Sequence, residues 1–162
     1  MSDSNRIFIS CVSREFQHPE DPNAPFAGLR EHLAHTLIGL DCEVKWQEVF
    51  HQPGDDTDTV RKVGESIRTC AAMIHLIGAQ PGARANAKAV ADYLQAEPGF
   101  LGKEPELRAA LGDFGDPTYT QWEVFQALHY GLRHIFLYAT RDGAKAQHEH
   151  LDRLRLARRY PG

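Results

Sequence analysis

The stretch Cys70-Ala71-Ala72-Met73-Ile74-His75-Leu76-Ile77-Gly78 is the longest apolar run in the chain. Its apolar residues follow one another without alternation, which is typical of a parallel strand that helices cover on both faces. The run is far shorter than the ~20 residues that span a bilayer. It therefore predicts a central buried strand over residues 71–78.

Working outward, shorter runs rich in β-branched and aromatic residues predict three further strands, at residues 6–12, 43–46 and 133–138. Stretches with apolar residues at helical spacing lie between and after them. These predict helices over 25–40, from Asp56 or Asp58 through Ile67, over 119–131 and over 145–159. Strand and helix alternate four times, which favours a single α/β domain with a doubly wound parallel sheet over residues 1–162.

Residues 79–117 interrupt this alternation after the third strand. Glycine and proline punctuate two weak helical patterns there, at about 85–96 and 104–112. The segment is too long for an ordinary connection, so we expect a helical insertion.

Composition excludes several classes of protein. Of the 162 residues, 42% are hydrophobic and 25% are charged, as in ordinary globular domains. The net charge of −4 gives no general attraction to nucleic acid or to anionic lipid. No signal peptide is recognisable, and the three cysteines form no C-x-x-C pair. We therefore expect a cytoplasmic protein without nucleic-acid or membrane partners.

Several common sites are not predicted. The chain has no phosphate-binding loop, no dinucleotide fingerprint after the first strand and no G-x-S-x-G motif. His32 and His35, like His148 and His150, are expected on solvated helix faces, so no metal site is predicted. His75 is interpreted as a core histidine that bonds to backbone.

Glu123 stands at the beginning of the predicted helix 119–131 and has two interpretations. The spacing Thr120-x-x-Glu123 fits a capping box, in which Glu123 only closes the helix start. At helical spacing, however, Tyr119, Glu123 and Tyr130 share one side. A carboxylate among aromatic rings can stabilise a developing oxocarbenium ion, and both roles are compatible.

Two loops belong with Glu123, because loops after parallel strands meet at one edge of a sheet. Ser10, Ser13 and Arg14 end the first strand and could hold a ribose or a phosphate, or form only a polar loop. The turn from Phe50 to Asp56 is either a surface loop or a contact and gating element.

Together these motifs resemble a Toll/interleukin-1 receptor (TIR) domain. They are Phe8-Ile9-Ser10 at the end of the first strand, Pro53-Gly54 after the second, and Tyr119-Thr120-Gln121-Trp122-Glu123 at the start of a late helix. The resemblance covers about residues 5–140 and is greatest to bacterial TIR-like domains at the N-terminus of larger defence or signalling proteins. It implies a flavodoxin-like fold.

For many bacterial members the resemblance also implies hydrolysis of NAD⁺ at its nicotinamide–ribose bond, with NAD⁺ as substrate and no further cofactor. Glu123 matches the position of the catalytic glutamate. Substrate would be bound by the residues around it and around the two loops, namely Ser10, Ser13, Arg14, Trp46, Phe50, Tyr119 and Trp122. Self-association would use an assembly loop, Gln52, Pro53, Gly54 and Asp55.

Three functions remain open on the sequence. The first is an NAD⁺ glycohydrolase that gives nicotinamide and linear or cyclic ADP-ribose and is activated by self-association in bacterial immune signalling. The second is a non-catalytic domain that signals by homotypic TIR–TIR contacts. The third is an enzyme similar to nucleoside deoxyribosyltransferases. The basic C-terminal stretch favours a domain cut from a longer chain, whose downstream domains would be partners.

Overall fold

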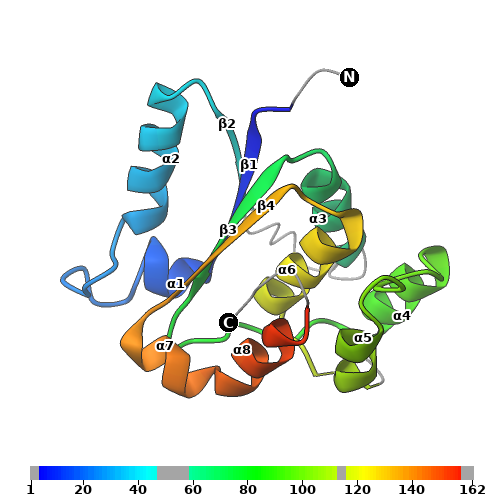
Figure 1. Ribbon diagram of the computed structural model, residues 1–162. Coiled ribbons are helices and arrows are strands. Elements are labelled where there is room, and N and C mark those ends of the chain that lie inside the picture. Colours follow the sequence, from blue (N-terminus) through cyan, green and yellow to red (C-terminus); the bar gives the residue numbers. More distant parts are fainter. Residues whose placement is uncertain (1–3, 47–58, 113–115, 158–162) are drawn as a thin grey trace.

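The computed structural model describes residues 4–46, 59–112 and 116–157 (Figure 1). Its helices and strands follow in the order β1 (Arg6–Ser10), α1 (Ser13–Phe16), α2 (Leu29–Gly39), β2 (Glu43–Trp46), α3 (Thr59–Arg68), β3 (Ala72–Ile77), α4 (Ala87–Ala96), α5 (Pro105–Leu111), α6 (Tyr119–Tyr130), β4 (His134–Ala139), α7 (Arg141–Ala146) and α8 (His148–Arg155).

The described strands form one parallel sheet in the order β2-β1-β3-β4. This confirms the predicted α/β class with a parallel sheet, and the order is compatible with a flavodoxin-like fold. The register sets Ser10 of β1 beside His75 of β3. Because neighbouring positions in a parallel register share a face, both side chains emerge on the same side of the sheet.

Three predicted boundaries were wrong. The first strand ends at Ser10, because Val12 is already the N-cap of α1, a helix that the sequence did not indicate. Helix α2 begins at Leu29 instead of residue 25, after Gly28 in the left-handed region at φ 72°. The predicted terminal helix is two helices, α7 and α8, which meet at Gln147.

The main core lies between the sheet and helices α3 and α6. The inward positions predicted for α3, Val60, Val63 and Ile67, are all buried, which confirms that prediction. They belong to one apolar cluster with Phe8 and Met73 from the same face of the sheet. A buried apolar side chain contributes roughly 1.5–3 kcal/mol, so this layer holds the strand ends and α6 in fixed positions.

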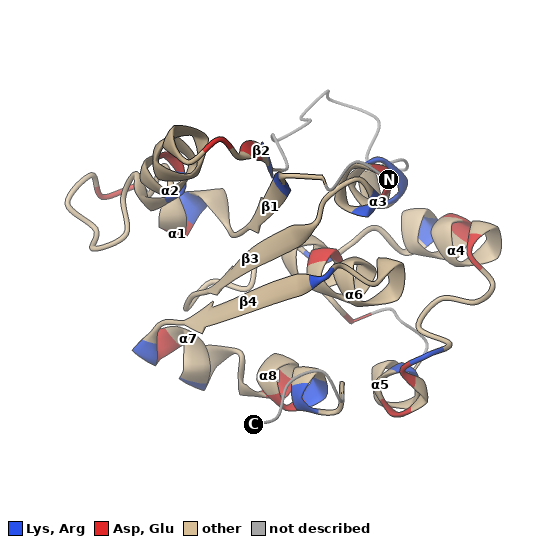
Figure 2. Cartoon of the chain, turned by 45° about the horizontal axis from the view of Figure 1, so that its top comes forward, with Lys and Arg blue, Asp and Glu red and all other residues tan. Residues whose placement is uncertain are grey.

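Helices α1 and α2 lie on the other side of the sheet from α3 and α6, so the sheet has helices on both faces (Figure 1). Cover on the α2 side is incomplete: Phe136 and Tyr138 of β4 are 59% and 56% exposed. Charged residues lie mainly on the helices, and β3 and β4 carry none (Figure 2). Within the described residues, no helix has the length and hydropathy needed to cross a membrane.

The expected helical insertion after β3 is present and contains α4 and α5, close to the predicted ranges. Its two ends meet again in an antiparallel bridge between Arg84 and Thr118. Gly82, at φ +89°, lies between the side chains of Val12 and Thr120, where an added Cβ would come within 3.3 Å of Val12. The start of the insertion therefore crosses between the loop after β1 and the beginning of α6.

Candidate functional site

Helix α6 begins with a capping box, although not the predicted one. The N-cap is Thr118, whose hydroxyl accepts from the Gln121 amide while the Gln121 side chain accepts from the Thr118 amide. The prediction that Thr120 and Glu123 form this box was therefore wrong. The helix starts two residues earlier, so Glu123 lies beyond N3 and its carboxyl group does not close the helix start.

The carboxyl group of Glu123 points instead at the end of β1. Ser10 Oγ donates to Glu123 Oε1 over 2.8 Å, and the two residues are 0% and 2% exposed. Glu123 Oε2 has no hydrogen-bond partner among the described residues. A buried carboxyl oxygen without a partner is costly, and such a group in a native structure is a candidate for a functional role.

Burial raises the pKa of Glu123 to about 8, because the charged form loses its hydration. The hydrogen bond from Ser10 and the positive charge of Arg30 act in the opposite direction and favour the carboxylate. A carboxyl group with a pKa near neutrality can exist in either form at the pH of a cell, as acid–base catalysis requires.

The network continues from Ser10 through two buried histidines. Ser10 Oγ lies 2.8 Å from His75 Nδ1, and His75 Nε2 lies 3.0 Å from His150 Nε2 on α8. Burial holds the pKa of His75 well below its usual value and that of His150 at about 3, so both rings are neutral.

Two sequence interpretations are corrected by this network. His75 is a buried strand histidine, as expected, but it bonds to the side chains of Ser10 and His150 and not to backbone. His150 is 2% exposed, whereas a solvated helix face was predicted. Residues two apart point to different sides of a helix, so His148 is exposed while His150 faces the core.

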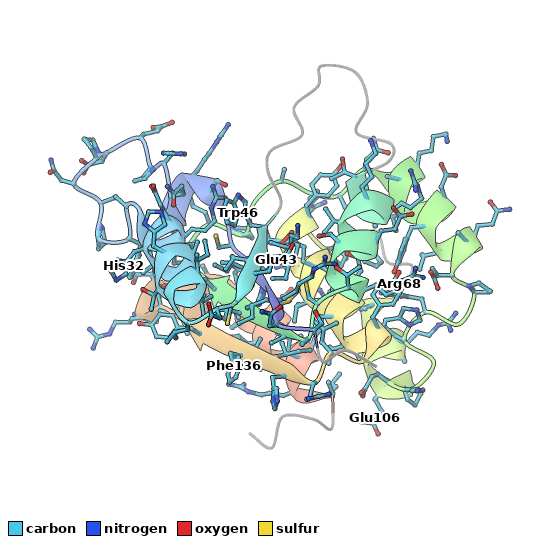
Figure 3. All side chains as sticks on the ribbon, turned by 90° about the horizontal axis from the view of Figure 1, so that it is seen from above. His32, Glu43, Trp46, Arg68, Glu106 and Phe136 are labelled. Atoms are coloured by element: carbon cyan, nitrogen blue, oxygen red, sulfur yellow. The ribbon has the colours of Figure 1, made fainter. Side chains whose placement is uncertain are left out.

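Arg30 of α2 is a site residue that the sequence analysis missed. Its guanidinium donates to Ser13 Oγ over 2.8 Å and lies 5.4 Å from the ring centre of Trp46. Trp46, labelled beside α2 in Figure 3, ends β2. Arg30 thus joins Ser13 and Trp46, two of the predicted substrate-binding residues, and its charge acts on Glu123. A single arginine within a helical pattern gave no signal for this role.

The remaining predicted aromatic residues take other partners. Trp122 is 1% exposed and packs against Phe100 and Tyr93. This side chain belongs to the core, which does not support the prediction that it binds substrate. Tyr119 Oη accepts from the Asn86 amide, and Tyr130 Oη lies 2.8 Å from Tyr93 Oη. The hydroxyl groups of Tyr119 and Tyr130 thus bond to α4 and its N-cap, away from Glu123.

Arg14 lies at the same sheet edge, on the wall of a cavity of about 390 Å³ that Gln80, Thr140 and Arg141 also line. The neighbouring Glu15 carboxylate accepts from the amides of Ala79 and Gln80. Phe50, Gln52, Pro53, Gly54 and Asp55 lie outside the described residues. Among the residues that are described, no group of three or more His, Cys, Asp or Glu is placed to hold a metal ion.

Chemically, the arrangement is an acid–hydroxyl–imidazole–imidazole series and not a nucleophile triad. In a Ser-His-Asp triad the imidazole stands between the hydroxyl and the acid. Here the Ser10 hydroxyl stands between Glu123 and His75, so the order of the groups differs from that of a triad. The arrangement holds one carboxyl group by a hydrogen bond from a hydroxyl that is itself bonded to an imidazole.

The fold and this site define the class: an α/β protein with a parallel sheet and a buried carboxyl group at the carboxyl edge of its strands. Comparisons with protein-family models, curated proteins and solved structures found no match to the chain. Function is therefore argued from the site itself.

Proposed function

We propose that this chain is a TIR-type NAD⁺ glycohydrolase and that Glu123 is its catalytic residue. The observation that carries the proposal is the Glu123 carboxyl group, held at Oε1 by Ser10 and left without a partner at Oε2 among the described residues. This oxygen has an unused acceptor position, which a ribose hydroxyl or a developing positive charge would satisfy once substrate displaces the side chains that bury it. The flavodoxin-compatible strand order and the motifs at Ser10 and Glu123 support the TIR assignment.

The proposed reaction needs one carboxylate. The bond between the nicotinamide nitrogen and the ribose C1′ breaks, and its electron pair neutralises the pyridinium ring that leaves. The ribosyl cation then takes a hydroxyl from water, which gives up a proton. Because the leaving group is neutral, no strong general acid is required, and the negative charge of Glu123 stabilises the cation.

Substrate binding itself favours the active form of Glu123. A pyridinium ring near a carboxyl group lowers the pKa of that group, because opposite charges stabilise each other. The charge of Arg30 acts in the same sense. We also propose that Arg30 and Ser13 contact the diphosphate and that Trp46 stacks on a ring of the substrate, since guanidinium groups bind phosphate in this manner.

The test is nicotinamide release from NAD⁺ by concentrated protein, followed by chromatography. Glu123→Gln keeps the shape and accepts the Ser10 hydrogen bond but cannot become negative. We expect it to lower the rate about 10²-fold or more, the size seen when other electrostatic stabilisers are removed. Glu65→Gln, on the exposed face of α3, is the matched control and retains activity. Equal cleavage by wild type and Glu123→Gln would refute the catalytic role.

A second candidate, a non-catalytic interaction domain, is favoured by the exposed aromatic residues of β4. Phe136 and Tyr138 lie on a strand whose only described neighbour is β3. An exposed apolar edge strand is a ready surface for association. Self-association that weakens in Phe136→Ser, together with no NAD⁺ cleavage by the associated wild type, would favour this candidate over the enzyme.

We propose further that the protein acts in the cytoplasm in bacterial immune signalling, with domains beyond this chain as partners. In this role, self-association through the loop Gln52–Asp55 activates the enzyme. Activity per molecule should then rise with protein concentration. A flat dependence over a wide range would argue against activation by assembly.

A further inference from the structure

Four buried polar groups form a continuous series from Glu123 to α8. The links are Glu123 Oε1 to Ser10 Oγ at 2.8 Å, Ser10 Oγ to His75 Nδ1 at 2.8 Å, and His75 Nε2 to His150 Nε2 at 3.0 Å. None of the four residues is more than 2% exposed. The proposed NAD⁺ cleavage uses only the first of them directly, so the two histidines require a separate explanation.

The hydrogen bonds in this series can run in only one direction at a time. A neutral imidazole carries one proton, so one ring nitrogen donates while the other accepts. When Glu123 is ionised, Ser10 donates to Glu123, His75 Nδ1–H donates to Ser10, and His150 Nε2–H donates to His75 Nε2. When Glu123 carries its proton on Oε1, every link is reversed: Glu123 donates to Ser10, Ser10 to His75 Nδ1, and His75 Nε2–H to His150 Nε2. The single ring proton of His150 then lies on Nδ1.

We propose that Ser10, His75 and His150 form a proton relay through which the carboxyl group of Glu123 exchanges its proton with the cavity beside α8. His150 lines that cavity, whose volume is about 470 Å³, and its Nδ1 has no partner among the described residues. The free nitrogen at one end and the unpartnered carboxyl oxygen at the other mark the two ends of the series.

The transfer balances as one added proton. Solvent water or a buffer acid gives a proton to His150 Nδ1. The Nε2 proton of His150 passes to His75 Nε2, the Nδ1 proton of His75 passes to Ser10 Oγ, and the Ser10 hydroxyl proton passes to Glu123 Oε1. Four N–H or O–H bonds form and four break, the first of the broken bonds being that of the external donor. Both rings therefore begin and end neutral with their tautomers exchanged.

The surroundings favour neutral rings along the whole series. His150 packs edge-on against the rings of His75 and Phe125, and the charge of Arg153 opposes its protonation. Near Glu123, the charged or titratable groups are Arg30 and the Cys11 thiol, whose pKa burial raises to about 12. The cavity at the His150 end is also lined by charged or titratable side chains, Arg84, Asp116, His148, Glu149 and Arg153.

One further acceptor competes within the series. The Thr120 carbonyl oxygen lies 3.4 Å from Ser10 Oγ, a longer contact than either of the two links at 2.8 Å. The shorter links have the better geometry, so the Ser10 hydroxyl is directed to Glu123 or to His75.

The role of the relay in catalysis rests on the proposed NAD⁺ cleavage. The existence of the relay does not depend on that function. A cationic substrate drives the proton off Glu123, and that proton leaves through His150 without crossing the substrate. Ser10, His75 and His150 are then positioning residues, which act on the reaction through Glu123.

The test needs no substrate and uses the intact chain with ¹⁵N-labelled histidine. Long-range proton–nitrogen NMR reports which ring nitrogen of His75 and His150 carries the proton, while the carboxyl carbon shift of Glu123 reports its ionisation. As Glu123 titrates, we expect both rings to exchange tautomers at the same midpoint without becoming doubly protonated. Rings that keep their tautomers, or that become doubly protonated at that midpoint, would overturn the relay.

Two variants separate the relay from a structural role. In Glu123→Gln both rings should hold one tautomer throughout the same pH range, because no proton moves on the side chain. In Ser10→Ala, Glu123 should still titrate while the rings no longer follow it. Tautomers that continue to exchange in either variant would refute the relay. Absence of NAD⁺ cleavage with tautomer exchange intact would refute the proposed function alone.

Discussion

Ser10 and Glu123, which are 113 positions apart in the chain, are joined by a buried hydrogen bond of 2.8 Å. Ser10 is the last residue of β1, and Glu123 lies in the second turn of α6, which packs on that face of the sheet. The bond ties the pKa of Glu123 to the position of the strand end.

Protein stability should fall as pH rises through the neutral range, because of Glu123. Its pKa is about 8 in the folded chain against 4.5 for the unperturbed group, so the folded state holds a proton that the unfolded state has lost. Stability is then greatest in the acid part of this window and decreases by up to ~1.4 kcal/mol per pH unit until the folded group ionises. Urea unfolding at several pH values measures this slope.

Glu123→Gln should remove that slope and be the more stable form at alkaline pH. Its amide accepts from Ser10 without a buried charge, so a gain of a few kcal/mol over wild type above about pH 8 is expected. The buried histidines make stability rise with pH, but only below their unfolded pKa, near 6.5. The reason is that their pKa is lowered in the folded chain, so the unfolded chain binds the extra protons. An unchanged slope in the variant would assign the effect to another group.

For the proposed enzyme, kcat/KM should rise with pH toward a plateau above about 8. The free enzyme must lose the Glu123 proton to present a carboxylate, and the pKa of that group is about 8. Below it we expect roughly tenfold per pH unit, as for one essential ionisation. Initial rates of nicotinamide release at low NAD⁺ concentration provide the measurement. If kcat/KM stayed constant from acid pH up to pH 8, ionised Glu123 would not be essential for the reaction.

Removing the charge of Arg30 should raise the pKa of Glu123 further, because a nearby cation favours the carboxylate. In Arg30→Gln we expect an upward shift of the pKa, visible in the carboxyl carbon shift of Glu123. Arg30→Lys keeps the charge but loses the flat contact with Trp46, so it should spare the pKa and raise KM for NAD⁺. Equal shifts in both variants would contradict this division of roles.

Gly143→Ala and Gly39→Ala should have opposite effects on stability. A Cβ on Gly143 would lie 2.2 Å from the Ile77 backbone oxygen, so α7 must move away from β3. We expect a loss of ~2 kcal/mol or more, as for other overpacked core positions. Gly39 ends α2 with nothing within 4 Å of its added Cβ, so alanine should gain about 0.5 kcal/mol there. Thermal unfolding of the two variants tests the pair.

Local patterns predicted the parts of this molecule that depend on periodicity and burial. The unbroken apolar stretch at 71–78 indicated β3, of which only Ile74 is not fully buried, and the spacing of Val60, Val63 and Ile67 indicated α3. The punctuation of residues 79–117 indicated α4 and α5. Helix α1 was missed because four residues are too few to show a period.

By itself the sequence determined the α/β class, the strands with small errors at their ends, and the location of Glu123 in an early turn of a late helix. Only the tertiary structure decided the partners of that residue. Ser10, Arg30, His75 and His150 reach it, directly or in series, from four other elements. Hydrogen bonds across 65 to 113 positions depend on strand register and helix packing, which no local spacing encodes.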